Sequence, residues 1–204
     1  MKNKILLLSI FLILLASNTY AATLGYTTAG ASASDATSYL CGSKFSSTGS
    51  NVTSKITASL ANGVTPGNNN YNVAIYTYSS SFSLVGNATY QNITTNIKSW
   101  YDFTTTINFS NNEIWLYAWG YYISGNQSNV YYDSGDANQG NISYETSYGN
   151  PSLNFPSSFS MGKQSTKKFS IYATYEPAST YSRNSTTTIN NGRININHGR
   201  LNIR

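Results

Sequence analysis

The sequence predicts an all-β protein, an antiparallel β-sandwich of the jelly-roll kind. Through most of the chain apolar residues recur at every second position, and turns rich in Gly and Asn separate the alternating segments. Beyond Ala21 no segment carries a sustained helical repeat of apolar residues, so no helix is expected there. About eight strands at a spacing of roughly ten residues are typical of a sandwich or jelly roll.

The alternation is clearest in Val52–Leu60, where apolar and small residues on one face alternate with Thr, Lys and Ser. Turns such as Thr48–Asn51 and Asp133–Asp136 separate the strands, because Gly and Asn tolerate positive φ. Gly140–Met161 holds two prolines and is expected to be a long loop. The expected strands are Tyr39–Ser46, Val52–Leu60, Val73–Tyr78, Thr89–Ile97, Trp100–Phe109, Glu113–Ile123, Asn129–Asp133 and Lys168–Glu176.

The N-terminus has the pattern of a secretory signal peptide. A basic start, Met1–Lys4, precedes the apolar run Ile5–Ala16, which is shorter than the ~20 residues that span a bilayer. Small residues then favour cleavage after Ala21; an uncleaved anchor is the alternative. The expected organisation is a helical signal peptide (1–21), a sandwich domain (22–177) and a basic, Asn-rich tail (178–204), with the mature protein secreted or held at the cell surface and no later transmembrane segment.

Charge and chemistry exclude several function classes. All seven carboxylates and six lysines lie between Asp35 and Glu176, so the body is near neutral and lacks the basic face that nucleic-acid binding needs. The single histidine, His198, is in the tail and Cys41 is the single cysteine, which excludes a Ser-His-Asp, Cys-His or His/Cys zinc site in the domain. The protein is therefore not expected to be an enzyme.

A carboxylate pair of the glycosidase kind is the remaining catalytic option, with glycoside hydrolysis a distant third among the expected functions. No expected strand carries two carboxylates a few residues apart on one face. The candidates are Asp102, Glu113, Asp133, Asp136 and Glu145.

The turn after the seventh expected strand offers oxygen ligands to Ca²⁺ through Asp133, Asp136 and Asn138. Two carboxylates and an amide are few for a cation that takes six to eight oxygens. A turn with solvated side chains is the favoured interpretation, and no cofactor is expected.

The segment Ile114–Tyr121 has one aliphatic and one aromatic face. If only the aliphatic face is buried, the aromatic residues form a platform on which sugars can stack. If the strand is covered on both sides the rings belong to the core, which is the favoured interpretation. The candidate ligand-binding residues are Trp115, Tyr117, Trp119 and Tyr121, with Trp100 lining the same face or capping its edge.

Asn-x-Ser/Thr sequons begin at Asn51, Asn87, Asn92, Asn108, Asn126, Asn141 and Asn184. About seven would arise by chance in this composition, so they permit glycosylation without establishing a glycoprotein. Asn51, Asn87 and Asn126 lie in expected turns and would be the most accessible. Cys41 is expected to be a buried thiol, with an intermolecular disulfide as the alternative.

The tail repeats itself. Gly192–Ile196 recurs as Gly199–Ile203, each copy alternating aliphatic residues with Arg and Asn. Such a segment is strand-like and can add to a sheet edge of its own domain or of a neighbouring subunit, where head-to-tail addition would build filaments. Disorder is the alternative.

Several motifs resemble a prokaryotic family of secreted jelly-roll-like modules with similarity to lectin or concanavalin-like sandwiches. The resemblance covers about residues 23–177 and rests on Gly25–Thr27, Cys41–Phe45, Val52–Thr57, Asn72–Tyr76, Trp100–Phe103, Tyr131–Gly135 and Phe169–Tyr175. It implies a secreted structural or adhesive module of the cell surface. The tail lies outside the resemblance, and assembly through its strand is a separate expectation from the repeat. A carbohydrate-binding module that contacts a surface glycan through aromatic residues is the alternative.

Overall fold

The structure is a computed structural model that describes residues 21–37, 39–63, 67–122, 127–144 and 155–178, with three tail segments, 188–189, 194–197 and 200–203. Fourteen strands of the domain form one sheet whose strand pairs are antiparallel, so the all-β prediction is confirmed. Among the described residues, no helix has the length and apolar character needed to cross a membrane. The expected signal peptide lies outside the described residues.

The strands in chain order are β1 (Ala22–Gly25), β2 (Ser32–Asp35), β3 (Tyr39–Asn62), β4 (Asn69–Tyr78), β5 (Phe82–Asn87), β6 (Gln91–Ile93), β7 (Ser99–Thr104), β8 (Asn108–Tyr122), β9 (Ser128–Ser134), β10 (Gly140–Tyr144), β11 (Ser158–Phe159), β12 (Lys163–Ser165), β13 (Lys167–Phe169), β14 (Ile171–Pro177), β15 (Thr188–Ile189), β16 (Ile194–Asn197) and β17 (Arg200–Ile203). The main path through the sheet is β1-β14-β3-β8-β4-β5-β11.

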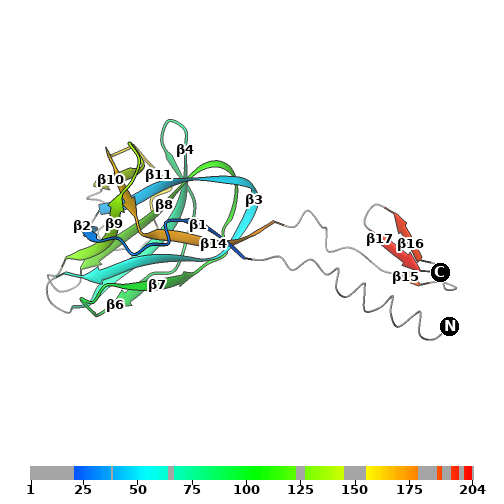
Figure 1. Ribbon diagram of the computed structural model, residues 1–204, viewed down its shortest axis with the longest axis horizontal. Helices are drawn as coiled ribbons and strands as arrows, with labels where there is room; N and C mark the ends of the chain where they lie inside the picture. Colours follow the sequence, from blue (N-terminus) through cyan, green and yellow to red (C-terminus); the bar gives the residue numbers. More distant parts are fainter. Residues whose placement is uncertain are drawn as a thin grey trace.

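The long strand β3 organises the sheet, and Figure 1 shows it curving through the domain. Its first half lies between β10 and β8, and its second half lies between β14 and β7. Two expected strands and the turn between them are therefore one strand, so a turn at Thr48–Asn51 is wrong. A bulge between Ser47 and Ser50 replaces it, with Gly49 at a φ of 72°.

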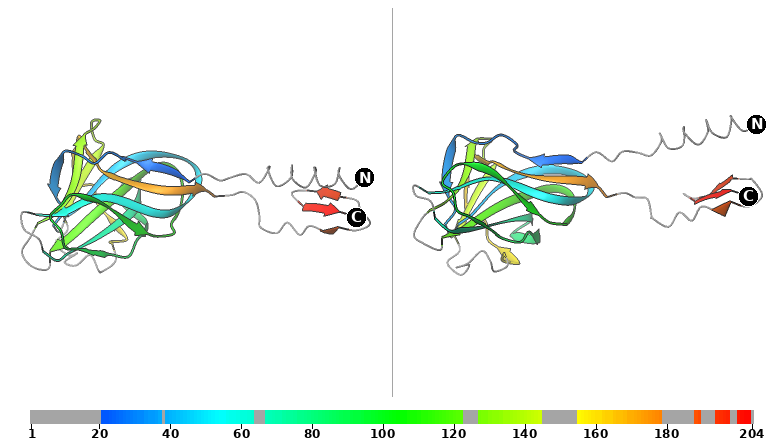
Figure 2. Two further views of the ribbon diagram at one scale, coloured as in Figure 1. Left: turned by 60° about the horizontal axis from the view of Figure 1, so that its bottom comes forward. Right: turned by 90° about the horizontal axis from the view of Figure 1, so that it is seen from below.

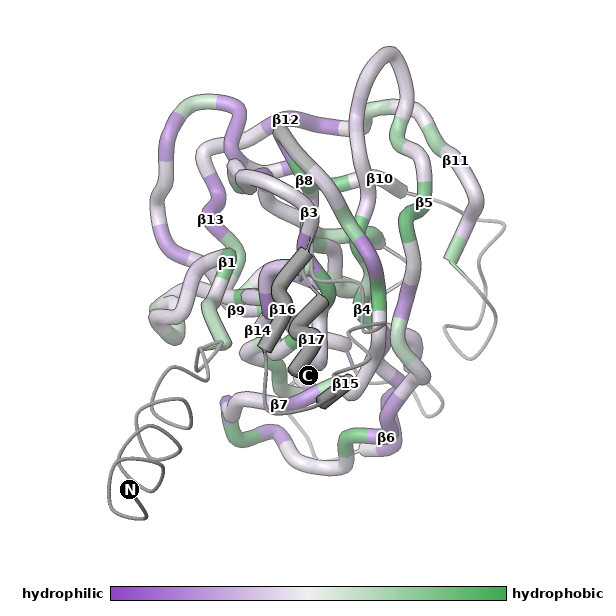
Figure 3. The backbone as a smooth tube through the Cα atoms, turned by 90° about the vertical axis from the view of Figure 1, so that its right-hand side faces the viewer, coloured by the Kyte–Doolittle hydropathy of each residue, from purple (hydrophilic) through white to green (hydrophobic). Residues whose placement is uncertain are grey.

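Two hydrophobic clusters fill the domain. The larger cluster joins inward residues of β4 and β8, such as Ile75 and Leu116, to Ile56 of β3 and Ile171 of β14. The smaller cluster lies on the other side of β8 and contains Trp115, Tyr117 and Trp119 with rings from β4, β5 and β11. Figure 3 shows hydrophobic stretches along β5 and β8, two of the strands that contribute side chains to these clusters.

Several expected boundaries are wrong. Thr89–Ile97 contains only the short strand β6, and Phe82–Asn87, where no strand was expected, is β5. Gly140–Met161 contains β10 and β11 and is not wholly a loop. β5 pairs with the preceding strand β4 across a short connection, whereas β6, β10 and β11 are short strands that pair with segments farther away along the chain, which local alternation does not reveal.

The tail strands pair with one another in a separate sheet. β16 runs antiparallel to β17, with Ile194 opposite Ile203 and Ile196 opposite Leu201, and β15 runs parallel to β17. The described residues of the two copies of the repeat thus pair with each other as antiparallel strands.

Candidate functional site

The aromatic residues of β8 belong to the core. Trp115, Tyr117 and Trp119 are at most 1% exposed. Phe82 of β5 packs edge-on against the first two, with ring centroids 5.2 and 5.4 Å away, and Phe155 packs against Trp119 at 5.6 Å. These three rings therefore belong to the core, as the favoured interpretation expects, and do not form an exposed platform, because other rings cover them.

The remaining two candidates lie elsewhere. Tyr121 is half-buried near the end of β8. Trp100 lies on β7, opposite Ser59 of β3, and is half-buried. Its neighbour Tyr101 packs against the larger cluster, so Trp100 points to the opposite, outer face of the sheet.

An aromatic pair marks this outer face. The ring of Tyr172 on β14 lies 5.4 Å from that of Trp100, at an interplanar angle of 66°. Both side chains are half-buried. Tyr172 is opposite Thr57 of β3, and Thr57 is also opposite Asp102 of β7. Three neighbouring strands thus place the two rings and a carboxylate on one surface.

An ion pair lies beside the rings. Lys55 Nζ is 2.6 Å from Asp102 Oδ2, and the Thr57 hydroxyl donates to Asp102 Oδ1 at 2.6 Å. The hydrogen bonds from Lys55 and Thr57 lower the pKa of Asp102, and the bond to Asp102 raises the pKa of Lys55. Both side chains remain more than a third exposed. The pair is therefore charged at neutral pH and open to polar groups of a ligand.

A second group of contacts holds the segment Tyr26–Ala31 in place. Asp133 accepts hydrogen bonds from the Tyr26 hydroxyl and the Ala31 amide, both at 2.8 Å, and these bonds lower its pKa. Lys168 Nζ lies 4.6 Å from the Tyr26 ring centre, and Lys98 donates to the Gly30 carbonyl at 3.0 Å. Asp133 thus serves to hold a loop.

These contacts bear on the expected calcium turn. Both carboxylate oxygens of Asp133 already accept protein hydrogen bonds, and the Gln139 side chain accepts from the Asp136 amide. Asn138 occupies the turn with a φ of 61°, a conformation that Asn tolerates. Within the described residues no group of three or more His, Cys, Asp or Glu side chains could hold a metal.

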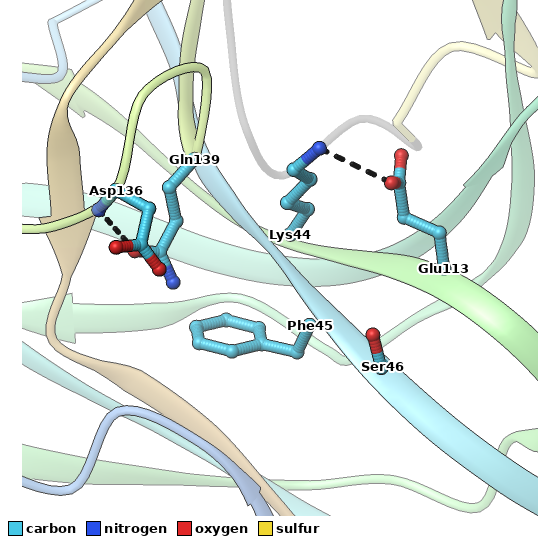
Figure 4. Close-up of a pocket in the computed structure, with 6 residues that line it drawn as sticks. All are labelled: Lys44, Phe45, Ser46, Glu113, Asp136 and Gln139. Atoms are coloured by element: carbon cyan, nitrogen blue, oxygen red, sulfur yellow. Dashed lines mark hydrogen bonds and ion pairs between the residues drawn. The ribbon is translucent and has the colours of Figure 1, made fainter.

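A hollow of about 330 Å³ lies farther along β3. Figure 4 shows Asp136 and Gln139 on one side of it and the ion pair of Lys44 with Glu113 on the other, 3.3 Å apart. The second carboxylate oxygen of Glu113 accepts from the Trp115 indole at 3.0 Å. The hollow therefore brings together two of the carboxylates that the sequence offered for catalysis, but Lys44 and Trp115 already engage Glu113.

The asparagine side chains of the sequons differ in how deeply they are buried. Asn51 is 3% exposed, and its amide nitrogen donates to the Ser47 hydroxyl and to the carbonyls of Thr48 and Gly49. Its expected accessibility is wrong, because the side chain bonds within the bulge. Asn87 is half-buried and bonds to the Ala88 carbonyl, whereas Asn126 lies outside the described residues. Asn92 and Asn108 are exposed.

Comparison with known proteins finds no matching family model, no matching curated protein and no matching solved structure. The geometry of the site therefore carries the functional argument.

Tyr172 and Lys55 are site residues that sequence reasoning missed. A signal was present, because the inward alternation of Phe169, Ile171 and Ala173 places Tyr172 on the opposite face. The alternation does not predict that β14 and β7 pair with the same stretch of β3, which is what brings Tyr172 next to Trp100.

Proposed function

We propose that the protein is a secreted cell-surface module of jelly-roll-like sandwich architecture that adheres to glycans through its outer face. The observation that carries the proposal is the half-exposed pair of Trp100 and Tyr172 beside the charged pair of Lys55 and Asp102. A sugar ring presents apolar C–H faces and a rim of hydroxyls. Aromatic rings suit the first, and a carboxylate next to an ammonium suits the second.

The position of the chain ends fits an adhesive module. Ala22 at the start of β1 is opposite Tyr175 of β14, and both strands leave the same end of the domain in Figure 2. Trp100 is opposite Ser59, eight residues along β3 from Asn51, where β14 ends its pairing. At about 3.3 Å per residue this is roughly 26 Å. A chain tethered by its ends would hold the aromatic pair away from the tether.

The sandwich assignment and the lectin-like resemblance are part of this proposal. The larger hydrophobic cluster supports the sandwich assignment, because inward residues from both halves of β3 and from their neighbouring strands pack together in it. The proposal includes no catalysis, since the side chains of the outer-face site offer one carboxylate held by a lysine and a threonine.

Binding to immobilised and insoluble polysaccharides tests the proposal. Trp100→Ala and Tyr172→Ala should each weaken retention about two- to tenfold, the effect of ~0.5–1.5 kcal/mol of ring contact. Tyr90→Ala is the matched control, because Tyr90 is 42% exposed and lies outside this site. Retention that survives both site variants, or that falls equally in the control, would contradict the proposal, as would the absence of binding to every glycan tested.

A further inference from the structure

The outer face extends from the aromatic pair to β9 and β13. Val130 and Tyr132 of β9 pack with the larger cluster. Tyr131 and Asp133 alternate with them along the strand and therefore point to the outer face. Lys168 of β13 is opposite Asp133 in the register and shares that face. This end of the outer face thus carries an aromatic ring, a carboxylate and an ammonium group.

A row of hydrogen bonds connects this end to the aromatic pair. The Ser170 amide donates to the Tyr131 carbonyl at 2.8 Å, and the Ser59 amide donates to the Ser170 carbonyl at 2.9 Å. Trp100 is opposite Ser59 on the other side of β3. Three inter-strand steps of ~4.8 Å separate Tyr131 from Trp100, which is roughly 14 Å along the row. A short oligosaccharide can span this distance.

Lys98 lies across this row. It immediately precedes β7 and is two positions before Trp100, which places it roughly 7 Å away along the chain. Its ammonium group donates to the Gly30 carbonyl at 3.0 Å and lies 5.0 Å from the centre of the Tyr131 ring. The Gly30 amide in turn donates to the Ser170 hydroxyl at 2.8 Å. The Lys98 side chain thus reaches from the β7 side of the row to its β9 side.

Ammonium groups outnumber carboxylates at this end of the face. Lys98 and Lys168 carry two positive charges against one negative charge on Asp133, and neither lysine forms an ion pair in the part of the chain that the structure describes. Both carboxylate oxygens of Asp133 already accept protein hydrogen bonds. Lys98 is exposed, and the Gly30 carbonyl takes one of its three N–H donors. The remaining donors and the excess positive charge favour an anionic group of a ligand.

We propose that the glycan of the outer face is an acidic polysaccharide, which stacks on Trp100 and Tyr172 and accepts hydrogen bonds from Lys98 through a carboxylate or sulfate group. An acidic ligand presupposes the proposed function, because the aromatic pair is the surface on which its sugars stack. The acidic group of such a sugar is attached at the edge of the ring, so stacking of the apolar face directs it sideways to a neighbouring side chain. A polymer repeats this group, and Lys168 lies farther along the same face to take a second one.

Solution affinities of the full chain for matched polymers test the proposal. Polygalacturonate is compared with the neutral polymer made by reducing its carboxylates, and dextran sulfate is compared with dextran. At least one acidic polymer should bind about tenfold or more tightly than its neutral counterpart, and the difference should shrink when the salt concentration rises from about 50 to about 500 mM. The two pairs distinguish a carboxylate from a sulfate as the group that Lys98 binds.

Variants of Lys98 test whether this preference arises at the row. Lys98→Gln keeps a donor for the Gly30 carbonyl but removes the charge, so it should weaken binding of the acidic polymer about three- to tenfold and leave the affinity for the neutral one unchanged. Lys98→Arg keeps the charge and should keep most of the preference. Lys163→Ala is the matched control, because Lys163 is an exposed lysine of β12 outside the row. Melting temperatures show whether each variant is folded.

The results that overturn an acidic ligand differ from those that overturn glycan binding. Equal affinity for acidic and neutral polymers, with both weakened in Trp100→Ala, overturns the acidic ligand and leaves the proposed function standing. A preference that survives Lys98→Gln, or that falls equally in Lys163→Ala, also overturns it. Polyglutamate that binds as tightly as the acidic polymer, with no effect of Trp100→Ala, would show attraction by charge alone and would overturn it too. Failure of every polysaccharide to bind contradicts the proposed function itself.

Discussion

Replacing Trp119 with alanine tests whether the aromatic face of β8 is core. The Trp119 side chain is 1% exposed, and its ring packs edge-on against Phe155. Burying a large aromatic side chain removes ~150–250 Å² from water, which at ~25 cal/mol per Å² corresponds to ~4–6 kcal/mol as an upper bound. Truncations of buried Phe and Trp cost ~3–5 kcal/mol. We therefore expect Trp119→Ala to lower the free energy of unfolding by about 3–5 kcal/mol.

Urea denaturation followed by far-UV circular dichroism measures this loss, and a thermal scan should show a fall in Tm of roughly 10 °C. Trp100→Ala is the matched control: it removes the same side chain from a half-exposed position and should cost less than about 1 kcal/mol. A Trp119→Ala variant as stable as the wild type, or a control that loses as much stability, would refute the assignment of this face to the core.

The remaining predictions concern protonation. Hydrogen bonds lower the folded-state pKa of Asp102 and Asp133 below 3.8, so the stability that each contributes is complete above the unfolded-state pKa and is lost as the pH falls through the folded pKa. The Tm should thus change little from pH 7 to about 5 and decline below about 4, with a smaller decline in Asp133→Asn; a collapse between pH 7 and 5 would contradict this. Burial raises the pKa of the Cys41 thiol to about 12, so Cys41 should resist a thiol reagent at pH 8 in the native protein and react once the chain is unfolded in urea. Native labelling at the rate of a free thiol would show that the thiol is accessible.

Local alternation was enough to predict which residues of several strands face inward. Ile56 and Leu60 of β3 and Ile171 and Ala173 of β14 are buried as their spacing indicates. The reason is that the two-residue period of a strand is a property of the backbone and holds whatever its partners are. The same period places Tyr172 on the opposite face, where the structure has its ring beside that of Trp100.

Prediction from local alternation failed where pairing with a distant strand determines which of two conformations a segment adopts. Thr48–Asn51 has the composition of a turn, but β8 pairs with β3 on both sides of it and turns it into a bulge. The buried amide of Asn51 then bonds to this bulge, which reverses the expectation that its sequon is accessible.

The sequence by itself determined the strand-forming pattern, the near neutrality of the domain and the concentration of arginines in the tail, because these follow from composition and from a two-residue period. Only the tertiary structure decided that both faces of β8 are covered and that Trp100 meets Tyr172 on the outer face. Each of these depends on which distant strands pair with β3 and β8. Pairing is settled by the packing of the whole core, and no short stretch of sequence contains it.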